Sequence, residues 1–355
     1  VFTQDADAAV RTKLVETGHA ENHVVFAPGG APAFLHTRLV GDENGDGEFE
    51  ELFDHRRTAV ARMNLDGARP TLLTDRDAGG RFADDGFLDT TPEASPDGAF
   101  ILWTSDRGNP ALGARLWVME AGGANPRQVA FADGAPTDGL EQDADPFWGA
   151  GDVIAFKRER FIGGTFSRVM VAALDRGTMT LSGVTVRTDG APGEFETNAP
   201  GDFDPKISPN GLWLASYRHL DDAFVYRYMG LDIPFGDWDA WVGLLSDPEE
   251  PGEASITRLA PDPRVSDVFP RWNRAGDRLA MWSVDMDAFD AGQDPQDIVV
   301  MDLALSPGPP ASVQVAARAN VTHAFPGGWR EGMPSWGTSP ADANRLVYSA
   351  LIDPY

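Results

Sequence analysis

Residues 41–51 carry the clearest chemical motif of the sequence. Asp42, Asn44 and Asp46 stand at alternate positions, and Gly47 follows them directly. Side-chain oxygens at this spacing, followed by a glycine that allows a sharp turn, are typical of the first half of a calcium-binding loop. The pattern therefore predicts a calcium site in this segment.

The second half of the same loop supplies further oxygen ligands. Glu48 would offer its backbone carbonyl, and Glu50 or Glu51 a carboxylate. An EF-hand requires a bidentate glutamate at its twelfth position, which is Phe53 here. The pattern instead resembles the shorter Asp-x-Asp-x-Asp-Gly loops inserted in the propellers of integrin-like proteins. We expect bound Ca²⁺ to rigidify the insert, and an ordinary solvated acidic loop is the alternative.

A second, weaker cation candidate consists of Asp285, Asp287 and Asp290. These aspartates have a similar spacing but lack the central glycine that a calcium loop needs for its turn. A solvated acidic loop is therefore the favoured interpretation of this segment.

Residues 224–238 are rich in aromatic side chains. The candidate partner-binding residues among them are Phe224, Tyr226, Tyr228, Phe235 and Trp238. Aromatic side chains this dense in an inserted loop either pack as a lid on the neighbouring strands or form a contact surface for a partner or ligand. The sequence leaves both possibilities open.

The elements that must position these residues come from a repeat. A block of strand, tight turn and strand recurs along the chain, and a third and a fourth strand can be read after most copies. The copies lie at residues 25–35, 91–105, 145–156, 204–216, 269–283 and 333–349. Repetition of a short strand unit at this spacing predicts a repeat architecture without long helices.

The two ends of the chain complete each other in this scheme. The sixth unit ends after its second strand, at residues 346–351, whereas residues 1–5 and 10–15 look like a third and a fourth strand with no first pair before them. Pairing the N-terminal strands with the C-terminal unit would close a ring and leave no free sheet edge. The count is then six units.

The repeat resembles the TolB-type, WD40-like propeller repeat. The resemblance rests on residues 95–98 (Ser-Pro-Asp-Gly), 116–119 (Leu-Trp-Val-Met) and 127–129 (Arg-Gln-Val), and it covers essentially the whole chain. It implies an all-β fold, a single six-bladed β-propeller of four-stranded blades. The expected blades are approximately residues 17–75, 87–131, 140–187, 200–260, 265–317, and 328–355 with 1–16. The resemblance implies no single activity, because the repeat occurs in envelope scaffolds, in the non-catalytic propellers of peptidases and in some lyases.

Acidic residues recur just before the expected innermost strands, and three histidines lie in similar positions. In a propeller these acids would either cap backbone N–H groups or form a negative channel mouth that holds a cation. His19, His23 and His323 would meet near that mouth across the ring closure. The acids are Asp89, Asp143, Asp145, Asp202, Asp204, Asp267 and Glu331.

Composition excludes several classes of function. The formal net charge of -26 rules against a nucleic-acid binder, because the phosphate backbone would be repelled. The absence of cysteine excludes disulfides, thiol nucleophiles and thiolate metal sites. No apolar run reaches the ~18 residues of a membrane span. Because the chain begins at Val1 without an initiator methionine, we expect a secreted or periplasmic protein whose signal peptide has been removed.

Non-catalytic recognition or scaffolding is the function that this combination predicts. A protein or glycan partner would bind the face that carries residues 41–57, 158–167, 221–240 and 284–295, within a larger envelope or extracellular assembly. The sequence has no Gly-x-Ser-x-Gly nucleophile motif and no phosphate-binding glycine loop. The alternative is a propeller enzyme, similar to a polysaccharide lyase or a hydrolase, that uses His19, His23 and His323 with nearby carboxylates at the channel mouth.

Overall fold

Strands make up nearly all the regular structure. The computed structural model describes residues 2–6, 11–14, 21–27, 33–40, 57–64, 71–76, 85–107, 113–136, 141–160, 166–189, 201–228, 231–246, 256–259, 261–262, 264–291, 296–308, 311–322, 329–337 and 343–352. Over these residues the only helices are α1 (Met286–Asp290) and a single 3₁₀ turn at Ala150–Asp152. The all-β prediction is therefore confirmed.

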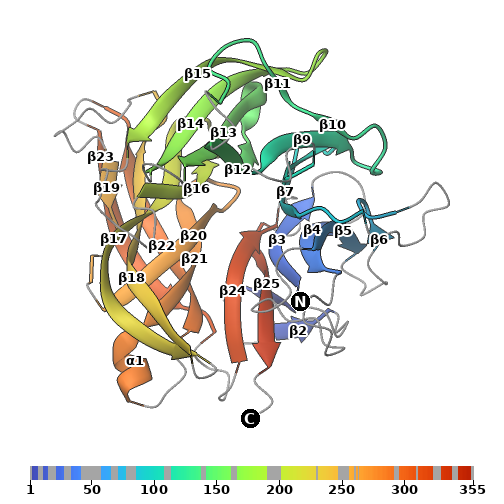
Figure 1. The fold of residues 1–355 in the computed structure, drawn as a ribbon. Helices are drawn as coiled ribbons and strands as arrows, with labels where there is room; N and C mark the ends of the chain where they lie inside the picture. The colour runs from blue at the N-terminus through green and yellow to red at the C-terminus, as the bar shows by residue number, and fades with distance from the viewer. Residues whose placement is uncertain are drawn as a thin grey trace.

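The strands form antiparallel sheets that follow one another along the chain (Figure 1). One four-stranded sheet contains β3 (Glu21–Ala27), β4 (Ala33–Leu39), β5 (Thr58–Asn64) and β6 (Thr71–Leu72). The next contains β7 (Asp89–Ala94), β8 (Phe100–Ser105), β9 (Arg115–Glu120) and β10 (Arg127–Gln128). A later one contains β20 (Val265–Trp272), β21 (Arg278–Asp285), β22 (Gln296–Ser306) and β23 (Ser312–Asn320).

The middle of the chain forms one larger sheet. It begins with β11 (Ala130–Phe131), β12 (Glu141–Trp148), β13 (Val153–Arg160), β14 (Phe166–Asp175) and β15 (Thr180–Asp189). It continues with β16 (Gly201–Ile207), β17 (Trp213–Tyr228), β18 (Leu231–Leu244) and β19 (Ile256–Arg258). The sheet contains two antiparallel sets of strands, β12 to β15 and β16 to β19. One parallel residue pair, Ser167–Gly201, links the two sets. Each set alone has the same up-and-down order as the four-stranded sheets.

The two ends of the chain share the remaining sheet. Its order is β2 (Arg11–Lys13), β1 (Phe2–Asp5), β25 (Arg345–Ile352) and β24 (Trp329–Trp336). Thr3 pairs with Val347, and the buried Tyr348 hydroxyl donates a 3.0 Å hydrogen bond to Gln4 Oε1. The N-terminal strand is thus fixed to the C-terminal hairpin by both backbone and side-chain contacts.

The first strand of each group of four antiparallel strands contains the same irregularity. We call β3, β7, β12, β16, β20 and β24 the inner strands; each packs against the next, and β24 packs against β3. Every inner strand contains a β-bulge, where an extra residue shifts the register and bends the strand. The bulge residues all have positive φ: His23 (49°), Thr91 (49°), Asp145 (49°), Asp204 (48°), Phe269 (54°) and Met333 (49°).

Proline explains why the bulges recur. Proline follows the bulge residue in five of the six inner strands, the exception being His23, which Val24 follows. Because proline has no N–H group to donate to a ladder, a bulge is one of the few places where a paired strand tolerates it. The recurring proline of the repeat therefore marks a bend in the inner strand.

The tight turns of the repeat are built by one hydrogen-bond pattern. In the second unit the Ser95 hydroxyl donates to Asp97 Oδ1 at 2.7 Å and accepts the Phe100 N–H at 2.9 Å. The turn that begins at Ser208 has the same two bonds, at 2.7 and 2.9 Å, with asparagine in place of aspartate. Gly98 and Gly211 close these turns at φ values of 70° and 71°, a conformation that favours glycine.

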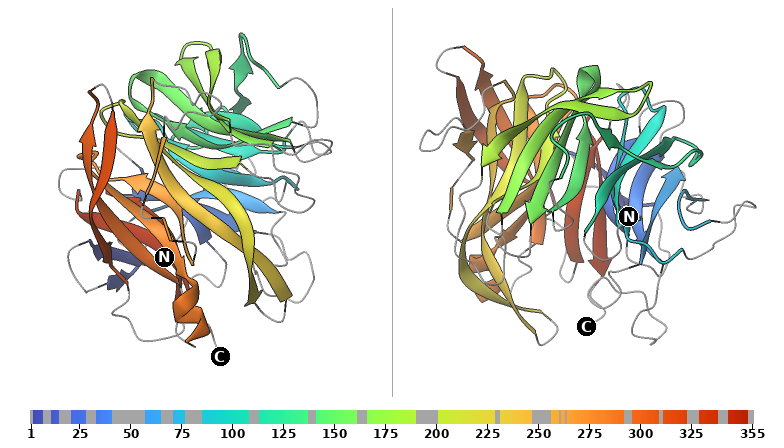
Figure 2. Two further views of the ribbon diagram at one scale, coloured as in Figure 1. Left: turned by 90° about the vertical axis from the view of Figure 1, so that its left-hand side faces the viewer. Right: turned by 45° about the horizontal axis from the view of Figure 1, so that its top comes forward.

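Apolar clusters fill the spaces between successive sheets. Two further views of the ribbon show how the sheets are arranged (Figure 2). Phe156 and Leu102 pack between the sheets of β13 and β8, and Trp213 and Leu279 pack between those of β17 and β21. Phe34 packs in one cluster with Val347, although the two residues are at opposite ends of the sequence. Burial of such side chains contributes about 1.5–3 kcal/mol each, so these interfaces are a main source of stability.

The aromatic segment at residues 224–238 is not a loop, contrary to the prediction. β17 and β18 have 16 and 14 residues and remain paired from Trp213–Leu244 to Tyr228–Leu231. The neighbouring strands pair with only the base of this hairpin, because β16 reaches His219 and β19 reaches Trp241. The rest is a two-stranded ribbon, the long yellow hairpin of Figure 1. Its aromatic and β-branched residues are types that favour a strand over a loop.

Candidate functional site

A group of charged side chains lies buried where the inner strands meet. Lys157 Nζ is 3.1 Å from both Asp145 and Glu159. Arg271 is 3.6 Å from Glu93 and 3.9 Å from Asp204, so carboxylates from two sheets share one guanidinium. We call the whole set the central cluster: His23, Glu93, Asp145, Lys157, Glu159, Asp204, Lys206 and Arg271.

The bulges explain why these residues meet. Asp145, Asp204 and His23 are themselves bulge residues, and Glu93 and Arg271 come two positions after a bulge. Successive side chains of a regular strand point to opposite faces of its sheet, and a β-bulge changes the direction in which the side chains at and after it point. Residues from six different stretches of sequence are thereby brought to the centre.

Lysine is concentrated in this cluster. The chain has three lysines, and two of them, Lys157 and Lys206, belong to it. Lys206 is 1% exposed, and its Nζ donates to Asp204 Oδ1 at 2.5 Å and to the Pro205 carbonyl at 3.1 Å. Lys206 and Lys157 also lie over the rings of Phe147 and Phe203, at 5.5 and 5.0 Å. Both ammonium groups are therefore held by carboxylates and by aromatic faces.

Burial and charge pairing set the protonation of the cluster. Burial opposes the charge of Lys157, but Asp145 and Glu159 more than offset this and raise its pKa, so it stays charged. Burial raises the pKa of Glu93 to about 7 against the opposing effect of Arg271. Burial lowers the pKa of His23 although Asp145 and Asp204 act to raise it, so the imidazole is neutral at pH 7. The cluster is close to electroneutral.

Four polar atoms of the cluster lack hydrogen-bond partners among the described residues. They are His23 Nδ1, Glu159 Oε2, Asp204 Oδ2 and Arg271 Nη1, and of these Glu159 Oε2 lies in an ion pair 3.1 Å from Lys157 Nζ. The His23 backbone N–H donates to Met333 Sδ at 3.2 Å, and its ring meets Phe269 edge to face at 6.2 Å. A buried polar atom without a partner is costly. The centre of the molecule thus retains binding capacity for water or a small polar molecule.

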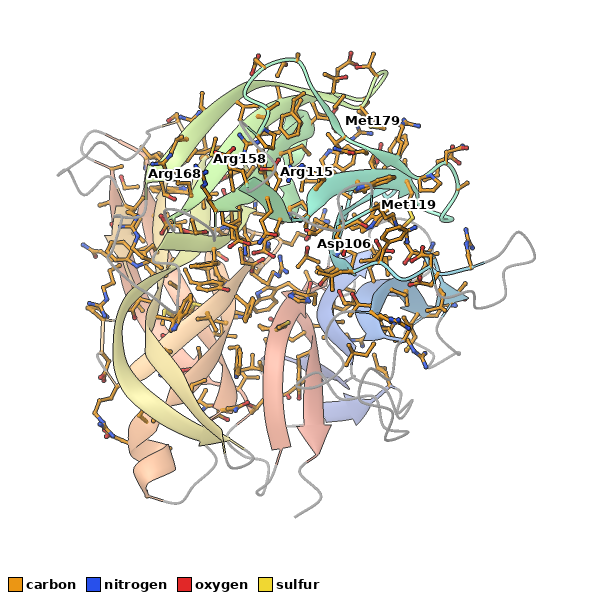
Figure 3. All side chains as sticks on the ribbon, in the orientation of Figure 1. Asp106, Arg115, Met119, Arg158, Arg168 and Met179 are labelled. Atoms are coloured by element: carbon orange, nitrogen blue, oxygen red, sulfur yellow. The ribbon has the colours of Figure 1, made fainter. Side chains whose placement is uncertain are left out.

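The predicted acidic ring divides into two groups. Asp89, Asp143, Asp202 and Asp267 each pair with an arginine. Arg158 and Arg218 lie on the adjacent strands β13 and β17, whereas Arg107 lies just after β8 and Arg318 on β23. Arg158, labelled in Figure 3, donates Nε to Asp143 Oδ1 at 2.6 Å and Nη2 to Oδ2 at 3.1 Å, and Arg218 holds Asp202 in the same way. These bidentate pairs are structural. Only Asp145 and Asp204 among the described acids of the ring face the central cluster.

Several predicted site residues fall outside the described residues. These are Asp42, Asn44, Asp46, Glu48 and Glu50 of the calcium loop, together with His19 and His323 of the alternative catalytic set. Of the three histidines, His23 is described, and it belongs to the central cluster. The calcium loop remains a prediction.

The second cation candidate makes ordinary structural contacts. Asp285 Oδ1 accepts the N–H groups of Asp287 and Ala288 at 2.8 and 3.2 Å, as a residue does that caps the start of a helix. Asp287 pairs with Arg264. The side chain of Asp290 lies outside the described residues.

Trp238 anchors the base of the aromatic ribbon. Its ring lies 5.2 Å from that of Phe203 and 5.5 Å from that of Tyr217. Further along the ribbon, backbone register places Phe224 opposite Phe235 and Tyr226 opposite Ile233. The side chains of these outer residues, and that of Tyr228, lie outside the described part.

The sequence analysis missed most of the central cluster. Glu93, Lys157, Glu159, Lys206 and Arg271 carry no motif, and their meeting depends on how the sheets pack. One signal was present: a chain with three lysines places two of them within or directly after the recurring strand block.

Comparison with known proteins supports the fold. No family model matches the chain. A putative TolB from Agrobacterium tumefaciens is 16% identical with a TM-score of 0.51, over 90% of this chain and 88% of that one. Kuenenia stuttgartiensis hydrazine synthase is 14% identical with a TM-score of 0.51, over 92% of this chain and 43% of that one. TolB from Acinetobacter baumannii is 12% identical with a TM-score of 0.49, over 82% of this chain and 54% of that one. The chain thus spans about half the length of the last two proteins. The predicted TolB-like propeller fold is confirmed, and identities this low bear on the fold alone.

Proposed function

We propose that this chain is a non-catalytic recognition scaffold, a closed six-bladed propeller that binds a protein partner through the ribbon of β17 and β18. The observation that carries the proposal is the ribbon itself. Among the described residues, β16 and β19 pair only with the base of this hairpin, and the hairpin extends beyond both of them. A secreted or periplasmic location and a larger envelope or extracellular assembly belong to the same proposal.

The six-bladed ring rests on three observations. Six inner strands with equivalent bulges pack in sequence, and the last packs against the first. β1 pairs with β25, so one sheet contains both ends of the chain. An apolar cluster that includes Phe34 and Val347 fills the space between the sheets of β4 and β25. A ring closed in this way leaves only the short outer strands of its blades as sheet edges.

The ribbon suits a protein partner because of its register. Phe224, Tyr226 and Tyr228 alternate along β17, and Phe235 and Ile233 stand opposite the first two. Residues at alternate positions of one strand and their direct cross-strand partners share a face. The ribbon therefore has one face rich in aromatic residues, the residue types that dominate protein interfaces.

The central cluster favours a scaffold over an enzyme. Lys157 and Lys206 are both held in ion pairs, and burial keeps His23 neutral. A general base or nucleophile must reach its substrate, whereas the side chains of Lys157 and Lys206 are 12% and 1% exposed. The cluster thus acts as a charged core that joins the inner strands.

The ribbon proposal is tested by site-specific photo-crosslinking in the cells that produce the protein. A benzophenone amino acid replaces Tyr226, and in a control it replaces Leu212, which is 46% exposed at a turn of the same unit. We expect a discrete protein adduct at position 226 only, which the added substitution Phe224→Ser weakens. Equal adducts at both positions, or adducts with glycan alone at position 226, would contradict the proposal.

An enzyme at the centre is the second candidate, favoured by the unpartnered His23 Nδ1 and Asp204 Oδ2. It would act on a polysaccharide or peptide, with His19 and His323 as further candidate groups. Turnover of acidic polysaccharides or short peptides that His23→Gln abolishes, while Leu212→Ala leaves it intact, would replace the scaffold proposal.

Calcium binding by residues 41–51 is part of the proposal. Asp42, Asn44 and Asp46 have the ligand spacing of a calcium loop, and Glu50 supplies a later carboxylate. A melting midpoint that calcium raises in the unmodified chain but less in Asp46→Asn would support the site. A midpoint that chelator leaves unchanged would contradict it.

A further inference from the structure

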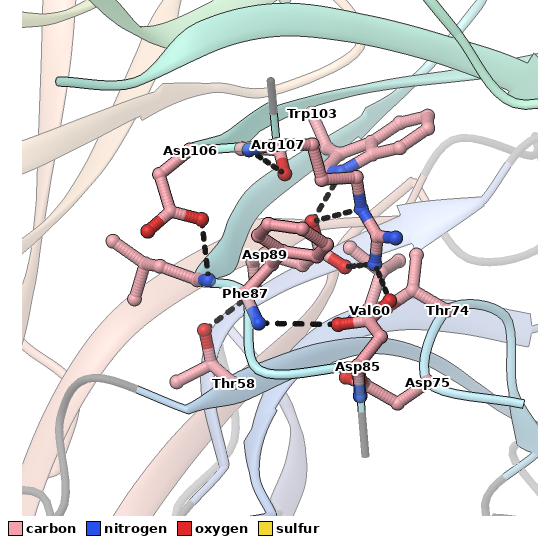
Figure 4. A network of polar contacts seen from close by, with 12 residues as sticks. Thr58, Val60, Thr74, Asp75, Asp85, Phe87, Asp89, Trp103, Asp106 and Arg107 are labelled. Atoms are coloured by element: carbon pink, nitrogen blue, oxygen red, sulfur yellow. Dashed lines mark hydrogen bonds and ion pairs between the residues drawn. The ribbon is translucent and has the colours of Figure 1, made fainter. Parts of the chain in front are cut away.

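Three carboxylates meet between the first two four-stranded sheets, away from the central cluster (Figure 4). Asp75 follows β6, Asp85 precedes β7, and Asp89 is the first residue of β7. One oxygen from each lies within 4.8 Å of the other two. No motif in the sequence connects these residues.

Two of the three carboxylates are fully engaged. Asp89 Oδ1 accepts from Trp103 Nε1 at 3.0 Å and from Arg107 Nε at 3.1 Å, while Oδ2 contacts Arg107 Nη2. Asp85 Oδ1 accepts the Phe87 N–H at 3.1 Å, and its Oδ2 contacts the same Nη2 of Arg107. One guanidinium therefore serves two carboxylates.

The third carboxylate is incompletely satisfied. Asp75 is 2% exposed, and its Oδ1 accepts the Asp85 N–H at 3.1 Å. Its Oδ2 has no hydrogen-bond partner among the described residues. A buried carboxylate oxygen without a donor is costly, and the carboxylates of Asp85 and Asp89 beside it are like charges. Asp75 therefore needs a positive charge or a proton.

The charges of the described residues at this site do not balance. Among them, three ionised carboxylates face the single guanidinium of Arg107, which leaves an excess of two negative charges. Asp106, whose Oδ1 accepts the Leu88 N–H at 2.8 Å, adds to the field around Asp89. In the equivalent position of the next unit, Asp143 is paired bidentately with Arg158. The excess is thus a property of this unit and not of the repeat.

We propose that Asp75, Asp85 and Asp89 bind a divalent cation of the hard, oxygen-preferring class, with calcium as the best fit. A divalent ion balances the two excess charges. Two ligands of one calcium ion lie at most about 5 Å apart. The three carboxylate oxygens lie within 4.8 Å of one another, so one calcium ion can contact all of them. This site is separate from the loop at residues 41–51.

The experiment is calorimetric titration of the chelator-treated full chain with calcium. The titrated chain carries Asp46→Asn, which alters only the loop at residues 41–51, so that this loop does not contribute. We expect one binding event, which the added substitution Asp75→Asn, which keeps the side-chain shape, should abolish. The control Asp133→Asn, an exposed acid outside the site, should leave the binding event unchanged.

A second measurement locates the ion without relying on calorimetry. Terbium replaces calcium, and its luminescence is sensitised by tryptophans nearby, here Trp103, whose indole N–H binds Asp89. We expect a signal that calcium displaces and that Trp103→Phe or Asp75→Asn reduces several-fold. Calcium binding that Asp75→Asn leaves unchanged, or terbium luminescence that is the same in Asp75→Asn, would overturn the proposal.

Discussion

Lys206 lies buried beside Asp204, and its replacement by methionine tests whether charge pairing holds the central cluster together. Methionine keeps most of the side-chain volume and removes the ammonium group. Asp204, 2% exposed, would keep Arg271, 3.9 Å away, and Lys157 as cationic neighbours. Breaking a buried pair by removing one partner costs about 3–5 kcal/mol, and the remaining guanidinium places the expected loss at about 3 kcal/mol.

The loss must depend on pH. In the variant, Asp204 can become neutral by binding a proton. For a carboxylate with the ordinary pKa of 3.8, protonation costs about 5 kcal/mol at pH 7.5 and about 2 kcal/mol at pH 5. These costs are upper limits for the destabilisation. In the variant the folded-state pKa of Asp204 is raised above its unfolded value, so stability falls as pH rises between the two values. Lys206→Met should therefore be much less harmful at pH 5.

The assay is urea unfolding of the full chain at both pH values, followed by tryptophan fluorescence and circular dichroism. The double variant Asp204→Asn with Lys206→Met removes both charges and should recover most of the loss. The matched control is Arg176→Met, whose carboxylate partners Asp97 and Asp152 are 50% and 31% exposed, with an expected loss of about 1 kcal/mol or less. A Lys206→Met loss below 1 kcal/mol that does not change with pH would refute the reasoning.

Three further outcomes are expected from the same unfolding assay. Phe34→Ala, at the cluster that joins the two ends of the chain, should cost about 3–5 kcal/mol, whereas Leu212→Ala should stay within about 0.5 kcal/mol; equal costs would contradict ring closure. Gly201→Ala should be far more harmful than Gly211→Ala: both have positive φ, but a Cβ at Gly201 would lie 2.2 Å from a backbone oxygen, and at Gly211 it meets nothing within 4 Å. Burial raises the pKa of Glu93 from 4.5 to about 7, so the chain should lose about 3 kcal/mol as pH rises from 4.5 to 7, and Glu93→Gln should remove this slope.

The sequence predicted the architecture well, because that information is local and repeated. Proline at the bulges and the Ser-Pro-Asp-Gly turn with its glycine restrict backbone geometry within a few residues. Each copy supports the interpretation of the others. The turn at Ser208 confirms this, since it repeats the hydrogen bonds of the turn at Ser95 with a different acceptor residue.

The candidate sites could be predicted only in part. His23 was singled out from its place before an inner strand, and it lies in the central cluster. The aromatic ribbon was identified by its composition, but its strand structure was missed. This insert occurs in one unit of the repeat, so the sequence offers no second copy of it with which the pattern could be compared. The acidic ring was predicted as one set, although four of its members pair with arginines.

The amino-acid sequence by itself determined the repeat, the all-β class and the bends of the inner strands, because turns and bulges depend on residues close together in the chain. Only the tertiary structure decided which charged residues meet. Lys157 and Arg271 join the same cluster although more than a hundred residues separate them, and Asp75 meets Asp89 through the packing of two sheets. Burial then gives these groups their unusual proton affinities, and burial is a property of the assembled sheets.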